Sequence, residues 1–280
     1  MVLIAGPTAS GKSALAIELA RAKNGVIINA DSMQVYRELR ILTARPSEAE
    51  EAQVRHRLFG HVAGAVDYSV AQWRRECVAE IEQALAAGRL PIICGGTGLY
   101  FMSLINGLST VPEISPEVRE KWRSFDGDLH TELTIRDSQS AVKLNPADRQ
   151  RLVRALEVVE STGVSLPDWQ AKAKVEAPLQ RFNVVKLHKN PPRDELYARS
   201  DRRFDYMLAQ GALEEVQSLP PLQPNQPLMK AIGVPELQSH LRGEITLERA
   251  RVLAQTATRQ YIKRQLTWAR GQMRDWIELR

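Results

Sequence analysis

Short apolar runs alternate with amphipathic stretches along the first third of the chain. The runs at residues 2–5, 26–29 and 91–94 consist almost entirely of apolar residues, which is the pattern of strands buried on both faces of a parallel sheet. Between them, apolar side chains recur at helical spacing from residue 12 and again from residue 70. This alternation of strand and helix predicts an α/β fold with a parallel sheet flanked by helices.

The pattern changes near residue 111, where amphipathic helical segments begin to follow one another without a convincing strand before residue 181. We expect these helices at residues 118–125, 129–135 and 147–161. A strand at 182–187 and helices at 193–210, 213–218 and 247–276 are expected after them. The chain is therefore expected to form an α/β core from residues 1–113 and 181–280, interrupted by a mainly helical insertion at 114–180.

The turn after the first strand carries the pattern G-x-x-x-x-G-K-[ST]. Its residues are Gly6, Pro7, Thr8, Ala9, Ser10, Gly11, Lys12 and Ser13. A strand before it and a helix after it would direct backbone N–H groups and a helix N-terminus at one point, which suits a phosphate. Lys12 adds a positive charge for the outer phosphate, and the Ser13 hydroxyl is a candidate ligand for Mg²⁺. The pattern predicts a P-loop, which binds a di- or triphosphate without defining the reaction.

Polar residues follow the next two strands. Ligands bind outside the carboxyl ends of strands in open α/β sheets, so Asp31, Ser32 and Gln34 are expected to face the same crevice as the P-loop. Thr97 stands among three glycines after the third strand, an arrangement that fits close backbone approach to a ligand or a plain tight turn. Asp31 would serve as a metal ligand or as a general base, and residue spacing does not separate these roles.

The composition indicates a globular protein without a membrane span. The chain has 280 residues, of which 44% are apolar, but no apolar run approaches the length of about 18 residues that a membrane helix needs. A strand at the first residues leaves no room for a signal peptide, so a cytoplasmic location is expected. Cys77 and Cys94 fall in a predicted helix and a predicted strand, and we expect both to be buried thiols.

Basic residues gather in the second half of the chain, although the net charge is only +5. In the final helix, a basic stripe runs beside an apolar one at helical spacing, and it consists of Arg259, Lys263, Arg270 and Arg274. This stripe fits either the solvated edge of a packed helix or a surface for a nucleic-acid backbone, with Tyr261 and Trp268 nearby for stacking.

Several separate stretches together resemble one family, the tRNA dimethylallyltransferases, and the resemblance covers nearly the whole chain. The matching stretches are residues 6–13, 29–37, 43–47, 95–100, 148–151, 154–157, 258–261 and 263–268. Their order and spacing carry the resemblance. The chain departs from the common family pattern at Ser13 and Arg45, where threonine and lysine are usual, and it has no cysteine/histidine finger after Trp276. It therefore resembles the shorter bacterial form.

The resemblance implies transfer of a dimethylallyl group from its diphosphate to N6 of adenosine-37 in tRNAs that read codons beginning with U. It implies that Asp31 is the base toward the adenine N6, that Gln34 reads the flipped base, and that Lys12 holds the diphosphate. Thr97 and Arg119 are placed near the reacting centre by the same resemblance. The implied tRNA-binding residues are Asp31, Ser32, Met33 and Gln34, together with Gln150, Arg151, Leu152, Val153 and Arg154.

The implied partners are the anticodon stem-loop of tRNA and dimethylallyl diphosphate, with Mg²⁺ as the cofactor and no membrane. A monomer is expected. Two other functions remain open from the sequence: an isopentenyltransferase that acts on free adenine nucleotides, and a P-loop kinase of small molecules. The basic surface of the second half argues against the first, and the absence of a second acid directly after an apolar strand near the loop argues against the second.

Overall fold

A computed structural model describes residues 1–109, 113–172, 177–224 and 226–280. Its strands form one six-stranded sheet in the order β3-β2-β4-β1-β5-β6, and every neighbouring pair is parallel. The strands are β1 (Val2–Ala5), β2 (Gly25–Asn29), β3 (Arg55–Arg57), β4 (Leu90–Gly95), β5 (Val185–Lys189) and β6 (Ile277–Leu279). All carboxyl ends therefore meet at one edge, and the predicted parallel α/β fold is confirmed.

The chain divides into two compact units. The first contains residues 1–104 and 179–280, and the second contains residues 105–178. The helical insertion expected from the sequence covered residues 114–180. A helical segment thus interrupts the α/β core between β4 and β5.

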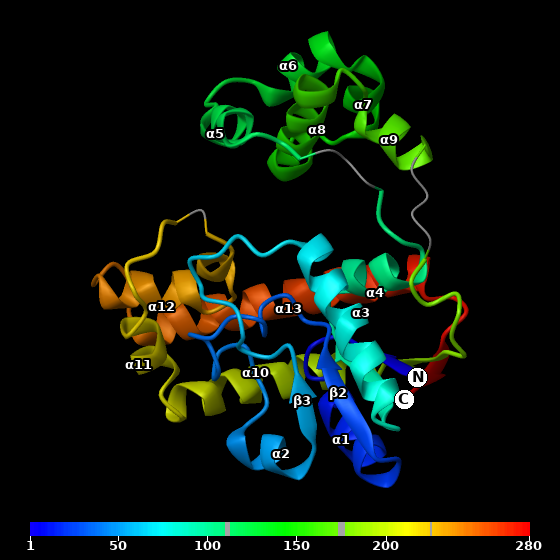
Figure 1. The fold of residues 1–280 in the computed structure, drawn as a ribbon. Coiled ribbons are helices and arrows are strands. Elements are labelled where there is room, and N and C mark those ends of the chain that lie inside the picture. Colours follow the sequence, from blue (N-terminus) through cyan, green and yellow to red (C-terminus); the bar gives the residue numbers. More distant parts are fainter. Residues whose placement is uncertain (110–112, 173–176, 225) are drawn as a thin grey trace. The chain divides into compact units, whose positions relative to one another are not determined.

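In the first unit, helices cover a sheet whose central strands β1, β2 and β4 are almost entirely buried. These helices are α1 (Lys12–Ala22), α2 (Glu48–Gln53), α3 (Val70–Ala86), α4 (Gly98–Ile105), α10 (Arg193–Ala209), α11 (Ala212–Gln217), α12 (Val234–Leu241) and α13 (Leu247–Gln272), with a short 3₁₀ helix η1 (Pro227–Lys230). The long helix α13 crosses this unit and packs against α10 and α12 (Figure 1).

The second unit is a bundle of short helices around its own apolar core. It contains α5 (Pro116–Ser124), α6 (Leu129–Arg136), α7 (Ser138–Lys143), α8 (Arg149–Thr162) and α9 (Leu166–Lys172). Trp122, Leu133 and Leu156 are at most 1% exposed and pack in one cluster. Side-chain caps begin four of these helices, because Ser115, Asp128, Asp137 and Asp148 each accept a backbone hydrogen bond at a helix start.

Three local sequence predictions differ from the structure. The strand expected at 182–187 begins instead at Val185, because the Phe182 N–H bonds back to the Leu179 carbonyl in a turn. The residues at 48–58 are polar and their sequence predicts a helix, but the helix ends at Gln53 and the chain continues into the edge strand β3. The final helix ends at Gln272, and the edge strand β6 follows it. Both missed strands have three residues and largely exposed side chains, so they carry no strand-like apolar run.

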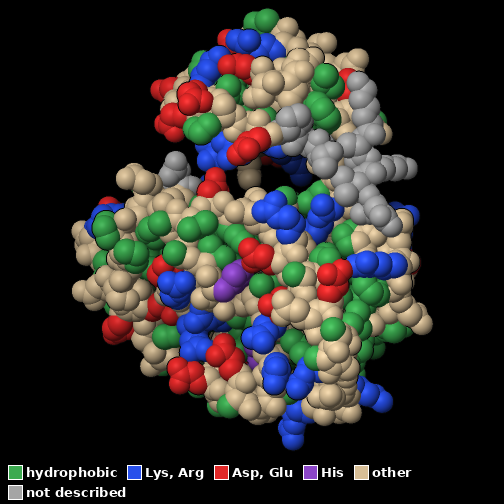
Figure 2. Space-filling model, viewed as in Figure 1, with side chains coloured by type: hydrophobic (Ala, Val, Ile, Leu, Met, Phe, Trp, Pro, Cys, Tyr) green, Lys and Arg blue, Asp and Glu red, His purple; other side chains and the backbone are tan. Residues whose placement is uncertain are grey.

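The described helices include none that is long and apolar enough to cross a membrane. Both cysteines are free and buried, as predicted. On the face shown in Figure 2, Lys and Arg side chains lie interspersed with Asp and Glu side chains.

Gly95 offers a test of how tightly the strand ends pack. A Cβ atom at Gly95 would lie 2.1 Å from the backbone carbonyl of Ala30, where neither group can move without shifting a strand end. We expect Gly95→Ala to lower the free energy of unfolding by about 3 kcal/mol or more. Chemical denaturation followed by circular dichroism measures this change.

The matched control is Gly271→Ala, because a Cβ atom there would meet nothing within 4 Å. Gly271 is exposed and helical, so alanine should leave stability unchanged or raise it by up to about 1 kcal/mol. Equal effects of the two substitutions would contradict the close approach of β4 to the chain after β2.

Candidate active site at the carboxyl edge of the sheet

The P-loop connects the end of β1 to the start of α1. Gly11 precedes the helix in the left-handed region (φ 85°), and Ala9 also has a positive φ of 62°. No side chain caps the N-terminus of α1, so its first N–H groups remain available to an anion. The Ser10 hydroxyl is buried without a hydrogen-bond partner within the described structure. The geometry is that of a phosphate-binding loop, as the sequence predicted.

Two side chains from the second half of the sequence hold this loop in place. Gln265 of α13 accepts a hydrogen bond from the Thr8 N–H (3.0 Å) and donates one to the Gly96 carbonyl (3.0 Å). Arg203 of α10 donates to the Thr8 hydroxyl. Gln265 therefore ties the P-loop to the turn after β4, and Arg203 brings a positive charge to the same place.

The site concentrates positive charge in a poorly solvated place. Burial lowers the pKa of the Lys12 ammonium, and the positive charge of Arg203 lowers it further, while Asp31 acts in the opposite direction. Burial likewise lowers the pKa of Arg203, and Asp31 again opposes the effect. A bound anion would relieve the desolvation and repulsion at both cations. This electrostatic arrangement favours a multiply charged ligand such as a diphosphate.

Asp31 is held by its neighbours with one carboxylate oxygen left open. Its N–H donates to the Asn29 side chain (2.8 Å), whose amide group donates in return to the Asp31 carbonyl (2.9 Å) and to the Leu58 carbonyl (3.0 Å). Oδ1 accepts a hydrogen bond from the Met33 N–H (2.9 Å). The other oxygen, Oδ2, has no hydrogen-bond partner among the described residues and is available to accept a proton or bind a cation.

Thr97 joins the turns after β2 and β4. Its N–H donates to the Ala30 carbonyl (3.1 Å), and its hydroxyl oxygen accepts from the Ser32 N–H (2.9 Å). The Thr97 hydroxyl in turn donates to the Ser32 hydroxyl at 3.3 Å. Thr97 and Ser32 are thus brought together at two strand ends, next in sequence to Asp31 on the β2 side.

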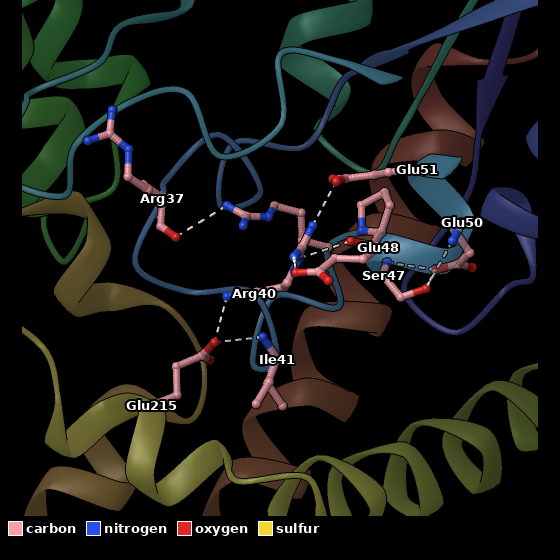
Figure 3. A network of polar contacts seen from close by, with 10 residues as sticks. Arg37, Arg40, Ile41, Ser47, Glu48, Glu50, Glu51 and Glu215 are labelled. Carbon is pink, nitrogen blue, oxygen red and sulfur yellow. Dashed lines mark hydrogen bonds and ion pairs between the residues drawn. The ribbon is translucent and has the colours of Figure 1, made fainter. Parts of the chain in front are cut away.

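Gln34 is anchored by a tight turn at residues 39–45. Its Nε2 donates to the carbonyls of Thr43 (2.8 Å) and Ala44 (3.1 Å). Because both partners are carbonyls, the amide nitrogen must face them, and Oε1 is left as a free acceptor. Arg45 and Gln34 line one cavity, and Arg45 donates to the Tyr36 and Arg37 carbonyls. Figure 3 shows the polar contacts around this turn.

Three cavities adjoin one another around Asp31 and Ser32, and only the middle one is lined by both residues. The largest, about 780 Å³, is lined by the P-loop, Asp31, Gln34 and Arg203. A second, about 270 Å³, shares Asp31 and Arg203 with it, and a third, about 290 Å³, shares Ser32, Tyr261 and Arg264 with the second. The third is largely apolar and lies against Thr97, Phe101 and Trp268. Asp31 lines the first two cavities, so a phosphate-bearing ligand and a second ligand can both reach it.

The remaining predicted site residues lie in the second unit. Arg119 is on α5, and Gln150, Arg151, Leu152, Val153 and Arg154 are on α8. Gln150 and Arg151 are exposed, whereas Leu152 and Val153 are 1% and 8% exposed and pack into the core of the unit. The side chains of Leu152 and Val153 therefore face the core, contrary to the tRNA contact that the resemblance implied for them. Arg154 donates to Glu157 at 3.2 Å.

Sequence reasoning missed two residues of the site, Arg203 and Gln265. Both are polar side chains on long helices far from the P-loop in sequence, and neither belongs to a motif with its own chemical signature. Gln265 lies inside one of the stretches that carry the family resemblance, which was the available signal. In the sequence, Arg203 is one of many arginines in the second half of the chain. Only the packing of α10 against the P-loop distinguishes it from the others.

A parallel sheet with a P-loop between β1 and α1 and an open carboxylate after β2, which β4 separates from β1, defines a P-loop NTPase-like fold. The family model described as IPP transferase matches residues 34–272. The chain therefore belongs to the IPP transferase family, and the family prediction made from the sequence is confirmed.

The most similar relatives include tRNA dimethylallyltransferases of Azorhizobium caulinodans and of a Bradyrhizobium species. The first is 52% identical over 99% of this chain and 90% of its own length, and the second is 53% identical over 99% and 93%. Among solved structures, a eukaryotic dimethylallyltransferase acting on tRNA matches with a TM-score of 0.81 and 31% identity, over 96% of this chain and 69% of that one. The tRNA isopentenylpyrophosphate transferase of Bacillus halodurans matches with a TM-score of 0.71 and 32% identity, over 99% and 88%.

Proposed function

We propose that the protein transfers a dimethylallyl group from dimethylallyl diphosphate to N6 of adenosine-37 in tRNAs that read codons beginning with U. The observation that carries the proposal is the meeting of the P-loop, Asp31 and Gln34 at cavities that reach the open Asp31 oxygen. Relatives named tRNA dimethylallyltransferase, at about half identity over nearly the full chain, support this function over a small-molecule kinase or an enzyme of free nucleotides.

The P-loop side of the site would bind and stabilise the leaving group. As the C1–O bond of the donor breaks, its electron pair goes to the diphosphate, where Lys12, Arg203 and the N-terminus of α1 meet the developing charge. The Ser13 hydroxyl and the Asp31 carboxylate line the same cavity and are oxygen ligands of the kind that Mg²⁺ takes. We propose Mg²⁺ as the cofactor, which would add positive charge beside the diphosphate.

The acceptor side of the site would supply a general base and a side chain that recognises the adenine. As the bond from N6 to C1 forms, the adenine amino group loses a proton, and Asp31 Oδ2, which has no hydrogen-bond partner among the described residues, would accept it. The Gln34 amide nitrogen is turned toward two carbonyls, and Oε1, which accepts no hydrogen bond from a described residue, would accept one from the second N6 hydrogen. The adenine must leave its stack to enter the cavity, and a single-stranded anticodon loop makes this step less costly.

The basic stripe predicted on the last helix divides into two parts in the structure. Arg259 forms an ion pair with Asp201 of α10 at 2.7 Å, so its role is packing between helices. Lys263, Arg270 and Arg274 instead line a groove of about 880 Å³. Arg193 and Arg280 come to the same groove from other segments, and Glu278 is the one carboxylate among its described lining residues. We propose that this groove binds the tRNA backbone.

We propose that the enzyme acts as a monomer. We also propose that the enzyme acts in the cytoplasm, where tRNA is used in translation.

The first test is the reaction itself. Unmodified tRNA incubated with the protein, Mg²⁺ and dimethylallyl diphosphate should yield N6-(dimethylallyl)adenosine, detected by mass spectrometry of the nucleosides. The reaction should proceed without ATP, because the P-loop holds the donor and no phosphoryl group is transferred; ATP should at most compete for the loop. A strict need for ATP turnover, or modification of free adenine nucleotides but not of tRNA, would refute the proposal.

Substitution of Asp31 separates its two possible roles. Asp31→Asn keeps the size of the side chain but removes the proton-accepting carboxylate, so a general base predicts a fall in the single-turnover rate of about 10²-fold or more with tRNA binding retained. A metal ligand predicts weaker diphosphate binding that is partly restored by more Mg²⁺. Single-turnover rates and donor dissociation constants at low and high Mg²⁺ measure the difference. A near-normal rate of Asp31→Asn at saturating Mg²⁺ excludes the general-base role of Asp31.

The groove is tested by its salt dependence. Replacing Lys263 and Arg274 with glutamine should weaken tRNA binding and reduce the slope of log affinity against log salt by about one to two units, with little change in melting temperature. Arg259→Gln is the matched control on the same helix, because it removes an ion pair within the protein. It should leave the salt slope unchanged. The assignment of the groove fails if Arg259→Gln reduces the slope as much as the double substitution does.

A further inference from the structure

Glu215 of α11 binds three successive backbone N–H groups of a distant turn. Its Oε1 accepts hydrogen bonds from the N–H of Arg40 (2.7 Å) and of Ile41 (2.8 Å), and its Oε2 accepts one from the N–H of Leu42 (2.9 Å). Figure 3 shows the carboxylate facing this turn from α11. Hydrogen bonds to a charged acceptor are the stronger kind, so this single side chain is a major anchor of residues 40–42.

The turn itself is compact and bent so that these N–H groups converge. The Ala44 N–H donates to the Ile41 carbonyl (2.9 Å), and the Thr43 hydroxyl donates to the Leu39 carbonyl (2.7 Å). Ala44 has a positive φ of 51°, which is unusual for a residue with a Cβ atom. Convergent N–H groups without an acceptor would be costly, and the Glu215 carboxylate supplies the acceptor.

The turn at residues 39–45 fixes the side chain of Gln34. The carbonyls of Thr43 and Ala44, directly after the residues that Glu215 binds, accept both hydrogen bonds of the Gln34 amide nitrogen. Gln34, Thr43 and Ala44 line the 780 Å³ cavity together with Asp31, while Glu215 is not among its lining residues. A chain of contacts therefore runs from Glu215 through the turn to Gln34 Oε1.

We propose that Glu215 is a positioning residue that, through the turn at residues 39–45, directs the Gln34 carbonyl oxygen toward the acceptor base. The proposal rests on the function proposed above and deepens it. With the carboxylate present, Gln34 is held in one orientation before the base arrives, so no ordering cost is paid on binding. Without it, the turn can move and the Gln34 amide loses its fixed partners.

A second anchor keeps the turn in place when Glu215 is changed. The Arg40 guanidinium donates to the Pro46 carbonyl (3.1 Å) and pairs with Glu48 (3.1 Å) and Glu51 (2.8 Å) of α2. These contacts do not involve α11. Substitution of Glu215 should therefore loosen the turn without unfolding the protein, which makes the effect on the reaction measurable.

The test compares Glu215→Gln with Glu214→Gln. Glutamine at 215 has nearly the same size, but its amide nitrogen can accept no hydrogen bond, so one edge of the three-donor site is lost. We expect the single-turnover rate with saturating donor to fall about 10-fold for Glu215→Gln. Glu214 is an exposed neighbour on the same helix, and its substitution should leave the rate unchanged. Glu215→Asp, which keeps the carboxylate, should restore part of the rate.

A double-mutant cycle with Gln34→Ala distinguishes positioning from general support. If Glu215 acts through Gln34, then Glu215→Gln should slow the Gln34→Ala enzyme by less than twofold. Hydrogen exchange should show faster exchange of the N–H groups of residues 40–42 in Glu215→Gln, whatever the activity. The inference is overturned by an unchanged rate in Glu215→Gln, by additive losses in the cycle, or by unchanged exchange.

The outcomes also separate this inference from the proposed function. If the unaltered protein transfers no dimethylallyl group to tRNA, the proposed function is refuted. If it does so and Glu215→Gln is equally active, only the role of Glu215 is refuted.

Discussion

The site depends on positive charge that the surrounding structure holds together. Lys12 and Arg203 stand near each other at the uncapped start of α1, and burial lowers the pKa of both. Such an arrangement is unfavourable by itself, because desolvation and mutual repulsion both oppose it. Asp31 offsets part of this cost. The surrounding structure must therefore hold the cations in place, and the side chains that clamp the loops do so.

These clamps are mainly side-chain amides and one carboxylate that bridge separate segments. Gln265 joins the P-loop to the turn after β4, and Asn29 joins the backbone of Asp31 to Leu58. An amide suits this task because one side chain both donates and accepts, so it can satisfy two loop backbones without adding a charge beside Lys12. Glu215 carries a charge, but it is not among the residues that line the cavity with Lys12 and Arg203.

Sequence reasoning succeeded where the pattern is set by local burial and failed where it is set by long-range packing. The strands β1, β2 and β4 are buried on both faces and stand out as apolar runs. The edge strands β3 and β6 have exposed, polar residues, so they look like helix or loop. In the site, the predicted strand ends indicated where Asp31 and Thr97 lie. The contact of Arg203 with the P-loop and the ion pair of Arg259 with Asp201 depend instead on how α10 packs, which the periodicity of the sequence does not encode.

The predicted site residues divide between the two units of the chain. The P-loop, Asp31, Thr97, Gln34 and the residues that clamp them belong to the first unit, whose sheet brings the strand ends together. Arg119 and the exposed residues of α8 belong to the second unit, which has its own apolar core. Because the P-loop, the strand ends and the side chains that clamp them all belong to the first unit, their mutual geometry is set by the packing of that unit.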